Sequence, residues 1–306
     1  MLFDFAFLAV SVAFLVKFSN MTIDNAENLS KIVRIGQAAI GFIFIAISTS
    51  LPELMIGIIS SLKGEGILSV GNLFGANIAN ITIVFGVMSL LGFKMAEKYR
   101  KQIRYAVILT SMVAFIMIVA GTLSLIFGMF CLSLFYIFSE GIIGRGLKSI
   151  GSGRDHAAHL LKHASCILVS IIGVIISAHF VTNSAIALAM KLGVAESLVA
   201  ATILSMGTTL PELSISASAV RRGDIGLAVG NVVGSLVANL TFILGTISIL
   251  GNIALTRTEI SIAAALMGFN ILFMLLTNNK KFGYREAAIL FSSYGVFLFI
   301  ILILGW

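Results

Sequence analysis

The stretch Thr49-Ser50-Leu51-Pro52-Glu53-Leu54 occurs a second time, nearly unchanged, as Thr208-Thr209-Leu210-Pro211-Glu212-Leu213. The two copies contain the only two prolines of the 306-residue chain, and they lie 159 residues apart. Each proline is followed by a glutamate inside a long apolar stretch. Proline interrupts helical hydrogen bonding, and a carboxylate is costly in a bilayer. A duplicated motif with both properties is typical of an ion-transport site.

The composition around these motifs is that of a polytopic membrane protein. The mean hydropathy is +1.10, and only 11% of the residues are charged, against about 25% in soluble domains. A membrane-spanning helix needs about 20 apolar residues, and continuous runs of this kind argue against a β-barrel. The first run lacks the basic start and cleavage site of a leader peptide, so we interpret it as a helix. We predict an all-α protein with ten spans, at residues 2–33, 35–61, 66–93, 104–121, 122–144, 164–191, 195–220, 225–250, 258–277 and 285–305.

The basic residues predict the orientation of these spans. Connections after even-numbered helices contain only Lys63, Lys191 and Arg257. By the positive-inside rule, the odd-numbered loops are expected in the cytoplasm and both termini outside. Topology therefore explains the net charge of +7, and the bilayer is the one partner indicated, with no nucleic acid and no obligate protein partner. The sixteen basic residues after odd-numbered helices are Lys31, Arg34, Lys94, Lys98, Arg100, Lys101, Arg104, Arg145, Lys148, Arg154, Lys162, Arg221, Arg222, Lys280, Lys281 and Arg285.

A second block repeats at the same spacing. The segment 71–80, GNLFGANIAN, aligns without a gap with 230–239, GNVVGSLVAN, and its paired glycines predict close helix packing. Because each half holds an odd number of helices, the second copy is expected to be inverted in the membrane. We predict a first repeat at 1–144, a cytoplasmic linker at 145–163 and a second repeat at 164–306. Helices two and seven are expected to be broken at Pro52 and Pro211, with the site at the repeat interface.

Glu53 and Glu212 are expected near the centres of helices two and seven. A carboxylate at this depth costs at least about 2.5 to 3.5 kcal/mol, so it should face a cavity and bind a cation or a proton. The alternative is a protonated glutamate that forms a hydrogen bond between helices. The occurrence of a glutamate in both equivalent motifs favours an ion-binding site over this alternative.

Neutral oxygen donors surround both glutamates in the sequence. Each proline is expected to free main-chain oxygens, around 46–49 and 205–208, unless it makes only a simple kink. Hydroxyl and amide side chains add further oxygens, although each amide could instead bond a neighbouring helix. An all-oxygen set suits hard cations such as Ca²⁺ and Na⁺. The candidate neutral ligands are Thr49, Ser50, Thr208, Thr209, Asn80, Asn239 and Ser235, the last standing where the first repeat has Ala76.

Other reactive residues carry less information. His156, His159 and His163 could bind a metal beside Asp155, but histidines in a solvated linker are commoner. The two cysteines, Cys131 and Cys166, are expected to be free, packed thiols. Because no nucleophile motif, nucleotide-binding loop or cofactor fingerprint is present, the sequence predicts neither an enzyme nor an ATP-driven pump.

At the two repeated blocks the chain resembles the calcium:cation antiporter superfamily, which includes sodium/calcium and proton/calcium exchangers. The resemblance implies alternating access, in which long first and sixth helices move beside a fixed core. It also implies that Ca²⁺ is held between Glu53 and Glu212. The matching positions are Thr49, Ser50, Glu53, Asn80, Thr208, Thr209, Glu212, Ser235 and Asn239.

The coupling ion depends on departures from that pattern. Sodium-coupled relatives often have a hydroxyl at the position of Ala76 and an acid at that of Asn239. Two glutamates can release two protons for each Ca²⁺, so the sequence favours H⁺. Na⁺ remains the alternative because the Gly-Asn-x-x-Gly form is similar to the sodium-coupled branch. A passive cation channel is the alternative from another class. The compact loops indicate a prokaryotic plasma membrane.

Overall fold

The structure is a computed structural model that describes residues 2–33, 36–64, 66–143, 154–191 and 205–304. It is mainly helical. The described part contains seven helices that are long and apolar enough to cross a membrane, or eight if one bent pair counts as a single span. The predicted spans at 195–220 and 285–305 run into residues outside the described part. A membrane protein built of helices is therefore confirmed.

The first motif lies at a bend between two helical pieces. After α1 (Leu2–Val33), one piece comprises α2 (Gln37–Ile40), the π-helical segment η1 (Gly41–Ala46) and α3 (Ile47–Thr49). The other is α4 (Leu51–Leu62), and the two pieces meet at an angle of 43°. Pro52 lies in the first turn of α4, where a missing amide hydrogen disturbs no helical bond.

The rest of the first half continues as a series of helices joined by short strands. The elements are α5 (Gly66–Ala79), the π-helical η2 (Asn80–Val84), α6 (Phe85–Leu90), β1 (Phe93–Lys94), α7 (Glu97–Ala120), β2 (Thr122–Leu123) and α8 (Leu125–Ile143).

The second half begins with α9 (Arg154–Lys191), which starts inside the predicted linker. Asp155 in its first turn and the alanines that follow favour helix there. The later elements are α11 (Ser205–Thr208), α12 (Leu210–Arg222), α13 (Ile225–Val237), the π-helical η5 (Ala238–Ile243), α14 (Leu244–Leu250), β3 (Ile253–Ala254), α15 (Arg257–Leu276), β4 (Lys281–Phe282) and α16 (Tyr284–Leu304).

The strands join distant parts of the chain. β1 pairs antiparallel with β4, where Phe93 lies opposite Phe282. β2 pairs antiparallel with β3, where Leu123 lies opposite Ile253. A shift of 159 residues, the spacing of the repeated motifs, moves β1 next to β3 in the sequence and β2 onto β4. The pairing of β1 with β4 is therefore the counterpart of the pairing of β3 with β2.

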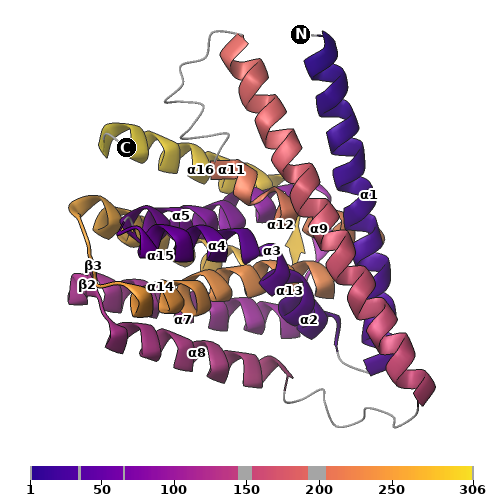
Figure 1. Cartoon of the computed structure of the whole chain (residues 1–306), viewed down its shortest axis with the longest axis horizontal. Helices are drawn as coiled ribbons and strands as arrows, with labels where there is room; N and C mark the ends of the chain where they lie inside the picture. Colours follow the sequence, from indigo (N-terminus) through magenta and orange to yellow (C-terminus); the bar gives the residue numbers. More distant parts are fainter. Residues whose placement is uncertain (1, 34–35, 65, 144–153, 192–204, 305–306) are drawn as a thin grey trace.

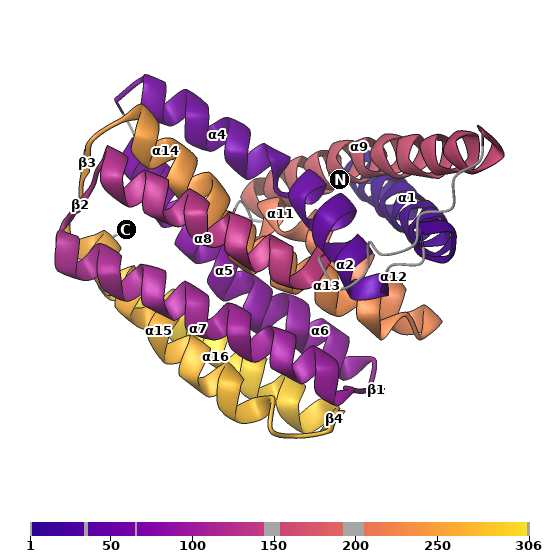
Figure 2. The ribbon, with the colours of Figure 1, turned by 90° about the horizontal axis from the view of Figure 1, so that it is seen from below.

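The two longest helices form a separate pair. Figure 1 shows α1 and α9 side by side, crossing the direction of the other helices steeply, and Figure 2 shows them together at one side of the molecule. The hydroxyl of Thr22 on α1 donates to the hydroxyl of Ser170 on α9 at 2.9 Å. The pair also touches the rest of the protein through α12, where the hydroxyls of Ser19 and Ser214 lie 2.6 Å apart.

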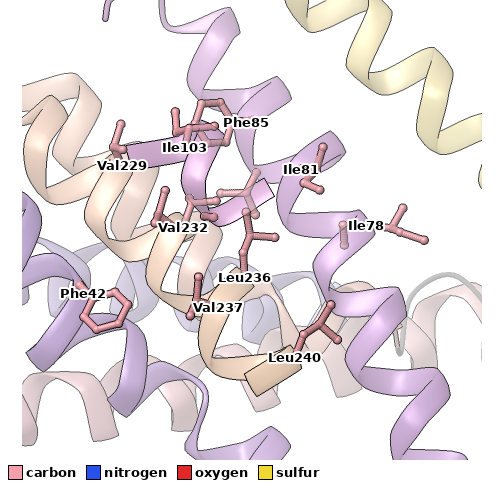
Figure 3. Packing of buried hydrophobic residues seen from close by; sticks show 14 of the residues in the cluster. Phe42, Ile78, Ile81, Phe85, Ile103, Val229, Val232, Leu236, Val237 and Leu240 are labelled. Atoms are coloured by element: carbon pink, nitrogen blue, oxygen red, sulfur yellow. The ribbon is translucent and has the colours of Figure 1, made fainter. Parts of the chain in front are cut away.

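Two other spans form the centre of the molecule. In each of Ser69–Leu90 and Ile225–Leu250, 83% of the most apolar window is buried, whereas the corresponding value for α8 is 17%. Figure 3 shows Val229, Val232 and Leu236 of α13 turned into this core, with Phe85 of α6 close by. Polar residues on these two spans are therefore shielded from lipid.

The predicted close packing is confirmed for Gly230 and Gly234 of the second copy of the block, whereas a Cβ atom at Gly75 of the first copy would meet nothing within 4 Å. A Cβ atom at Gly230 would collide with the backbone of Ala38 on α2. One at Gly234 would collide with the side chain of Ala46 on η1. Helix α13 therefore lies against the first half of the chain at backbone distance.

Candidate ion-binding site

The two glutamates occupy equivalent places at the starts of two helices. Glu53 lies in the first turn of α4 and Glu212 in the first turn of α12. Each is only 2% exposed. The carboxylates are close enough to repel each other electrostatically, while the positive end of each helix dipole stabilises negative charge there. The structure therefore brings the two predicted acids, from opposite halves of the chain, into one buried site.

Hydroxyl groups connect the two motifs. The hydroxyl of Ser235 on α13 donates to Oε1 of Glu212 at 3.5 Å, and the hydroxyl of Ser50 donates to that of Ser235, also at 3.5 Å. Thr49 is fully buried, and its side chain reaches the carboxylate of Glu212. Residues of the first motif thus contact the acid of the second. Both hydroxyl contacts are long for hydrogen bonds, so they hold these oxygens only loosely.

The predicted asparagines lie on π-helical turns. Asn80 is the first residue of η2, and Asn239 is the second residue of η5. Both are buried. Nδ2 of Asn239 donates to Oδ1 of Asn77 at 2.9 Å, and Nδ2 of Asn77 donates to the carbonyl oxygen of Leu236 at 2.9 Å. A π-helical turn is rare and often occurs at a functional site.

Several buried acceptor oxygens have no donor among the described residues. Those in the repeated segments belong to both carboxylates and to three amides, and a buried acceptor without a partner costs about 1 to 3 kcal/mol or more. A hard cation bound by oxygen ligands would satisfy such atoms, so the donor types present suit a cation such as Ca²⁺. In the repeated motifs and the aligned second block, the unpartnered oxygens are Oε2 of Glu53, Oε2 of Glu212, and Oδ1 of Asn80, Asn231 and Asn239. Three further oxygens without partners, Oγ of Ser61, Oε1 of Gln102 and Oδ1 of Asn270, lie outside these segments.

The predicted release of main-chain oxygens is wrong for Ala46. Its carbonyl oxygen accepts the amide of Ser50 at 3.0 Å and the hydroxyl of Thr49 at 3.1 Å. Pro52 removes the amide that would bond the residue four positions earlier, which is Ser48. The amide of Ser50 is intact, so Ala46 keeps its helical partner.

Two further predicted ligands lie at the second motif. Thr208 ends α11, and Thr209 precedes α12 with 3% of its surface exposed. Both lie within four residues of Glu212 along the chain. They stay predicted ligands.

One of the three linker histidines joins two helices. Among the described residues, no group of three His, Cys, Asp or Glu side chains could hold a metal ion. Nδ1 of His163 lies 2.9 Å from Oδ1 of Asn25, which joins α9 to α1. The side chain of His156 lies outside the described part of the chain. Both cysteines are free as predicted, and Cys131 is buried.

The structure adds polar residues that the sequence analysis did not select. Nδ2 of Asn231 donates to the main-chain oxygen of Glu212 at 3.2 Å and to the hydroxyl of Ser216 at 2.9 Å. Asn231 belongs to the repeated block, so a signal for it existed. Asn77 aligns with Leu236, and a search for duplicated polar residues therefore passes over it.

Comparison with known proteins gives one consistent result. The chain is 24% identical to the sodium/calcium exchanger MaX1 of Methanosarcina acetivorans, with 97% of this chain and 98% of that protein covered. It is 27% identical to the inner membrane protein YrbG of Escherichia coli, over 80% of this chain and 79% of that protein. A solved structure of the sodium-calcium exchanger NCX_Mj shares the fold, with a TM-score of 0.82, 24% identity and coverage of 99% of this chain and 98% of that one. A family model described as sodium/calcium exchanger protein matches residues 3–143 and 162–303. The chain therefore belongs to the sodium/calcium exchanger family, a family of transporters rather than enzymes.

Proposed function

We propose that this protein is a secondary-active antiporter that binds Ca²⁺ between Glu53 and Glu212 and exchanges it for a monovalent cation. The observation that carries the proposal is that both carboxylates are buried and that each keeps one oxygen without a partner among the described residues. A divalent cation would neutralise the pair and satisfy these oxygens at once. Thr49, Ser50, Thr208, Thr209, Asn80, Asn239 and Ser235 complete the proposed ligand set.

H⁺ is the coupling ion that the charge of the site favours. Two mutually repelling carboxylates cannot both stay ionised at low cost in a buried site after Ca²⁺ leaves. Two protons would replace the charge of one Ca²⁺. Ala76 and Asn239 add neither a hydroxyl nor a third carboxylate, so further cations would find few extra ligands.

Na⁺ is the second candidate, and the comparisons favour it. The matching family is described by sodium/calcium exchange, and the names of MaX1 and NCX_Mj state the same activity for those proteins. Because this chain is similar to proteins with that activity, exchange of Na⁺ for Ca²⁺ at the same two glutamates is the direct alternative.

We further propose that ten helices form two inverted repeats, 1–144 and 164–306, joined by a cytoplasmic linker at 145–163. The exchange of the two strand pairings under a shift of 159 residues supports this arrangement. In alternating access, α1 and α9 would move together past the central helices. Their mutual packing and their polar contact with α12 through Ser19 and Ser214 support a shared motion.

Ca²⁺ flux in proteoliposomes tests the proposal. Ca²⁺ uptake is measured under an imposed outward H⁺ gradient, an outward Na⁺ gradient, and no gradient. We expect gradient-dependent uptake that Glu53→Gln and Glu212→Gln each abolish, because either change removes one of the two charges that balance Ca²⁺. Glu140→Gln, at an exposed position on α8, is the matched control and should leave uptake unchanged.

Two outcomes would count against the proposal. Uptake that continues at the same rate without a counter-gradient would identify a passive channel. Uptake that persists in either glutamine variant would remove that glutamate from the site.

A further inference from the structure

A chain of hydrogen bonds fixes the orientation of the Asn77 side chain. It begins at the main-chain carbonyl of Leu236, which can only accept a hydrogen bond. The partner at 2.9 Å must therefore be the amino group of Asn77, Nδ2. Since the two atoms of an amide point in different directions, Oδ1 of Asn77 is turned away from Leu236. Asn77 is fully buried, so water cannot replace the hydrogen-bond partners of its side chain.

The same logic then orients Asn239. Oδ1 of Asn77 can only accept, so Asn239 must present its own amino group, and the distance is 2.9 Å. Oδ1 of Asn239 is consequently turned away from Asn77. It is one of the buried oxygens that have no donor among the described residues. One main-chain carbonyl thus decides which end of the Asn239 amide is left for a ligand.

Asn239 lies on the same helix face as a residue that contacts the acidic pair. Ser235 lies four residues earlier, on the same face of the helix, and its hydroxyl contacts Oε1 of Glu212. Without Asn77, the Asn239 amide could rotate by half a turn and present its amino group, which repels a cation. We propose that Asn77 is a positioning residue of the cation site, holding Asn239 so that it offers an oxygen; this rests on the proposed function.

The inference also accounts for an asymmetry between the repeats. Asn80 and Asn239 are equivalent in sequence, but the residue three positions before each is Asn77 in one half and Leu236 in the other. The amide of Asn77 crosses from α5 to α13 and bonds the main chain of its own repeat equivalent. The first half therefore supplies the support for a ligand on the second half.

A double-mutant cycle tests this role by the Ca²⁺ concentration for half-maximal exchange. The variants are Asn77→Ala, Asn239→Ala and the two combined. If Asn77 acts only through Asn239, each single variant should raise that concentration about tenfold, the effect of about one lost ligand bond. The double variant should resemble Asn239→Ala, because independent effects would instead multiply to about a hundredfold.

Two further variants separate positioning from simple stability. Asn270→Ala removes a buried amide that bonds Thr110 and Ser111 between α7 and α15. It should lower the melting temperature without raising the half-maximal concentration. Asn77→Asp has the same size and still accepts from Asn239, so it should raise that concentration less than Asn77→Ala does.

The proposal is overturned if Asn77→Ala or Asn239→Ala leaves the half-maximal concentration within twofold of the wild type. It is also overturned if the two effects multiply in the double variant. If Asn77→Ala does not fold, a tenfold rise in Asn77→Asp overturns it and a smaller one supports it. Failure of the proposed antiport function would give a different result. The wild type would then show no gradient-dependent Ca²⁺ uptake, or Glu212→Gln would retain it.

Discussion

At the scale of residues, the site consists of oxygens that the protein leaves without hydrogen-bond donors. Ordinary buried carboxylates are hydrogen-bonded or paired with a cation. Here Oε2 of both Glu53 and Glu212 has no donor in the described part of the chain. The surrounding helices place hydroxyl and amide oxygens nearby instead of basic side chains. Such an arrangement costs stability when empty of cations, and this cost favours ion binding.

A substitution at Asn239 tests whether its own amide must donate a hydrogen bond to Asn77. In Asn239→Asp, an ionised carboxylate would set an acceptor against Oδ1 of Asn77. We expect destabilisation by about 1 to 3 kcal/mol at neutral pH, the cost of an unsatisfied buried group. A protonated aspartate can donate, so the melting temperature of the variant should approach that of the wild type as pH falls. A deficit that stays constant with pH would contradict the donor role of Asn239.

At the scale of elements, the candidate site depends on helices that start or change geometry inside the protein. The 43° bend at Ser50 places the first turn of α4, with Glu53, inside the protein. The π-helical turns η2 and η5 carry Asn80 and Asn239. Close approach of α13 to α2 and η1 brings Ser235 to Ser50.

That close approach makes Gly230 sensitive to substitution. In Gly230→Ala, the new methyl group would meet main-chain atoms of Ala38, which cannot move aside as a side chain can. We expect destabilisation by about 1 to 3 kcal/mol or more, measured as a fall in melting temperature in detergent. Gly268→Ala is the control, because Gly268 is exposed on α15 and no heavy atom lies within 4 Å of its Cβ position. Equal melting temperatures for the two variants would exclude the packing role.

At the scale of the whole molecule, the two halves are interleaved. Each short strand of one half pairs with a strand of the other, and α7 packs along α15. The site likewise takes Glu53 from one half and Glu212 from the other. Neither half would contain a complete site alone, so an ion bound there would contact both.

The proposed orientation can be tested by labelling single cysteines in a variant without Cys131 and Cys166. Lys98, in the first turn of α7, and Lys63, after α4, are both exposed. If the basic loops are cytoplasmic, a cysteine at Lys98 should react with a membrane-impermeant maleimide only after the cells are opened. One at Lys63 should react in intact cells. The reverse pattern would invert the proposed topology.

The sequence alone determined the membrane class, the approximate helix positions and the two acids. These features follow from local composition, from the cost of charge in lipid, and from a repeat visible at one fixed spacing. Helix α9 begins ten residues before the predicted span, because helix propensity extends beyond the apolar run that marks a span. Family membership also followed from the two repeated blocks.

Only the tertiary structure decided how the donors meet. The bond between Ser50 and Ser235 joins positions 185 residues apart, and no local pattern encodes it. Asn77 became visible only through its bonds to Leu236 and Asn239, since its counterpart in the second repeat is the apolar Leu236. Duplication in the sequence identifies residues that act in equivalent pairs. A residue that supports its partner across the repeat interface is defined by geometry, because the contact exists only after the two halves have packed together.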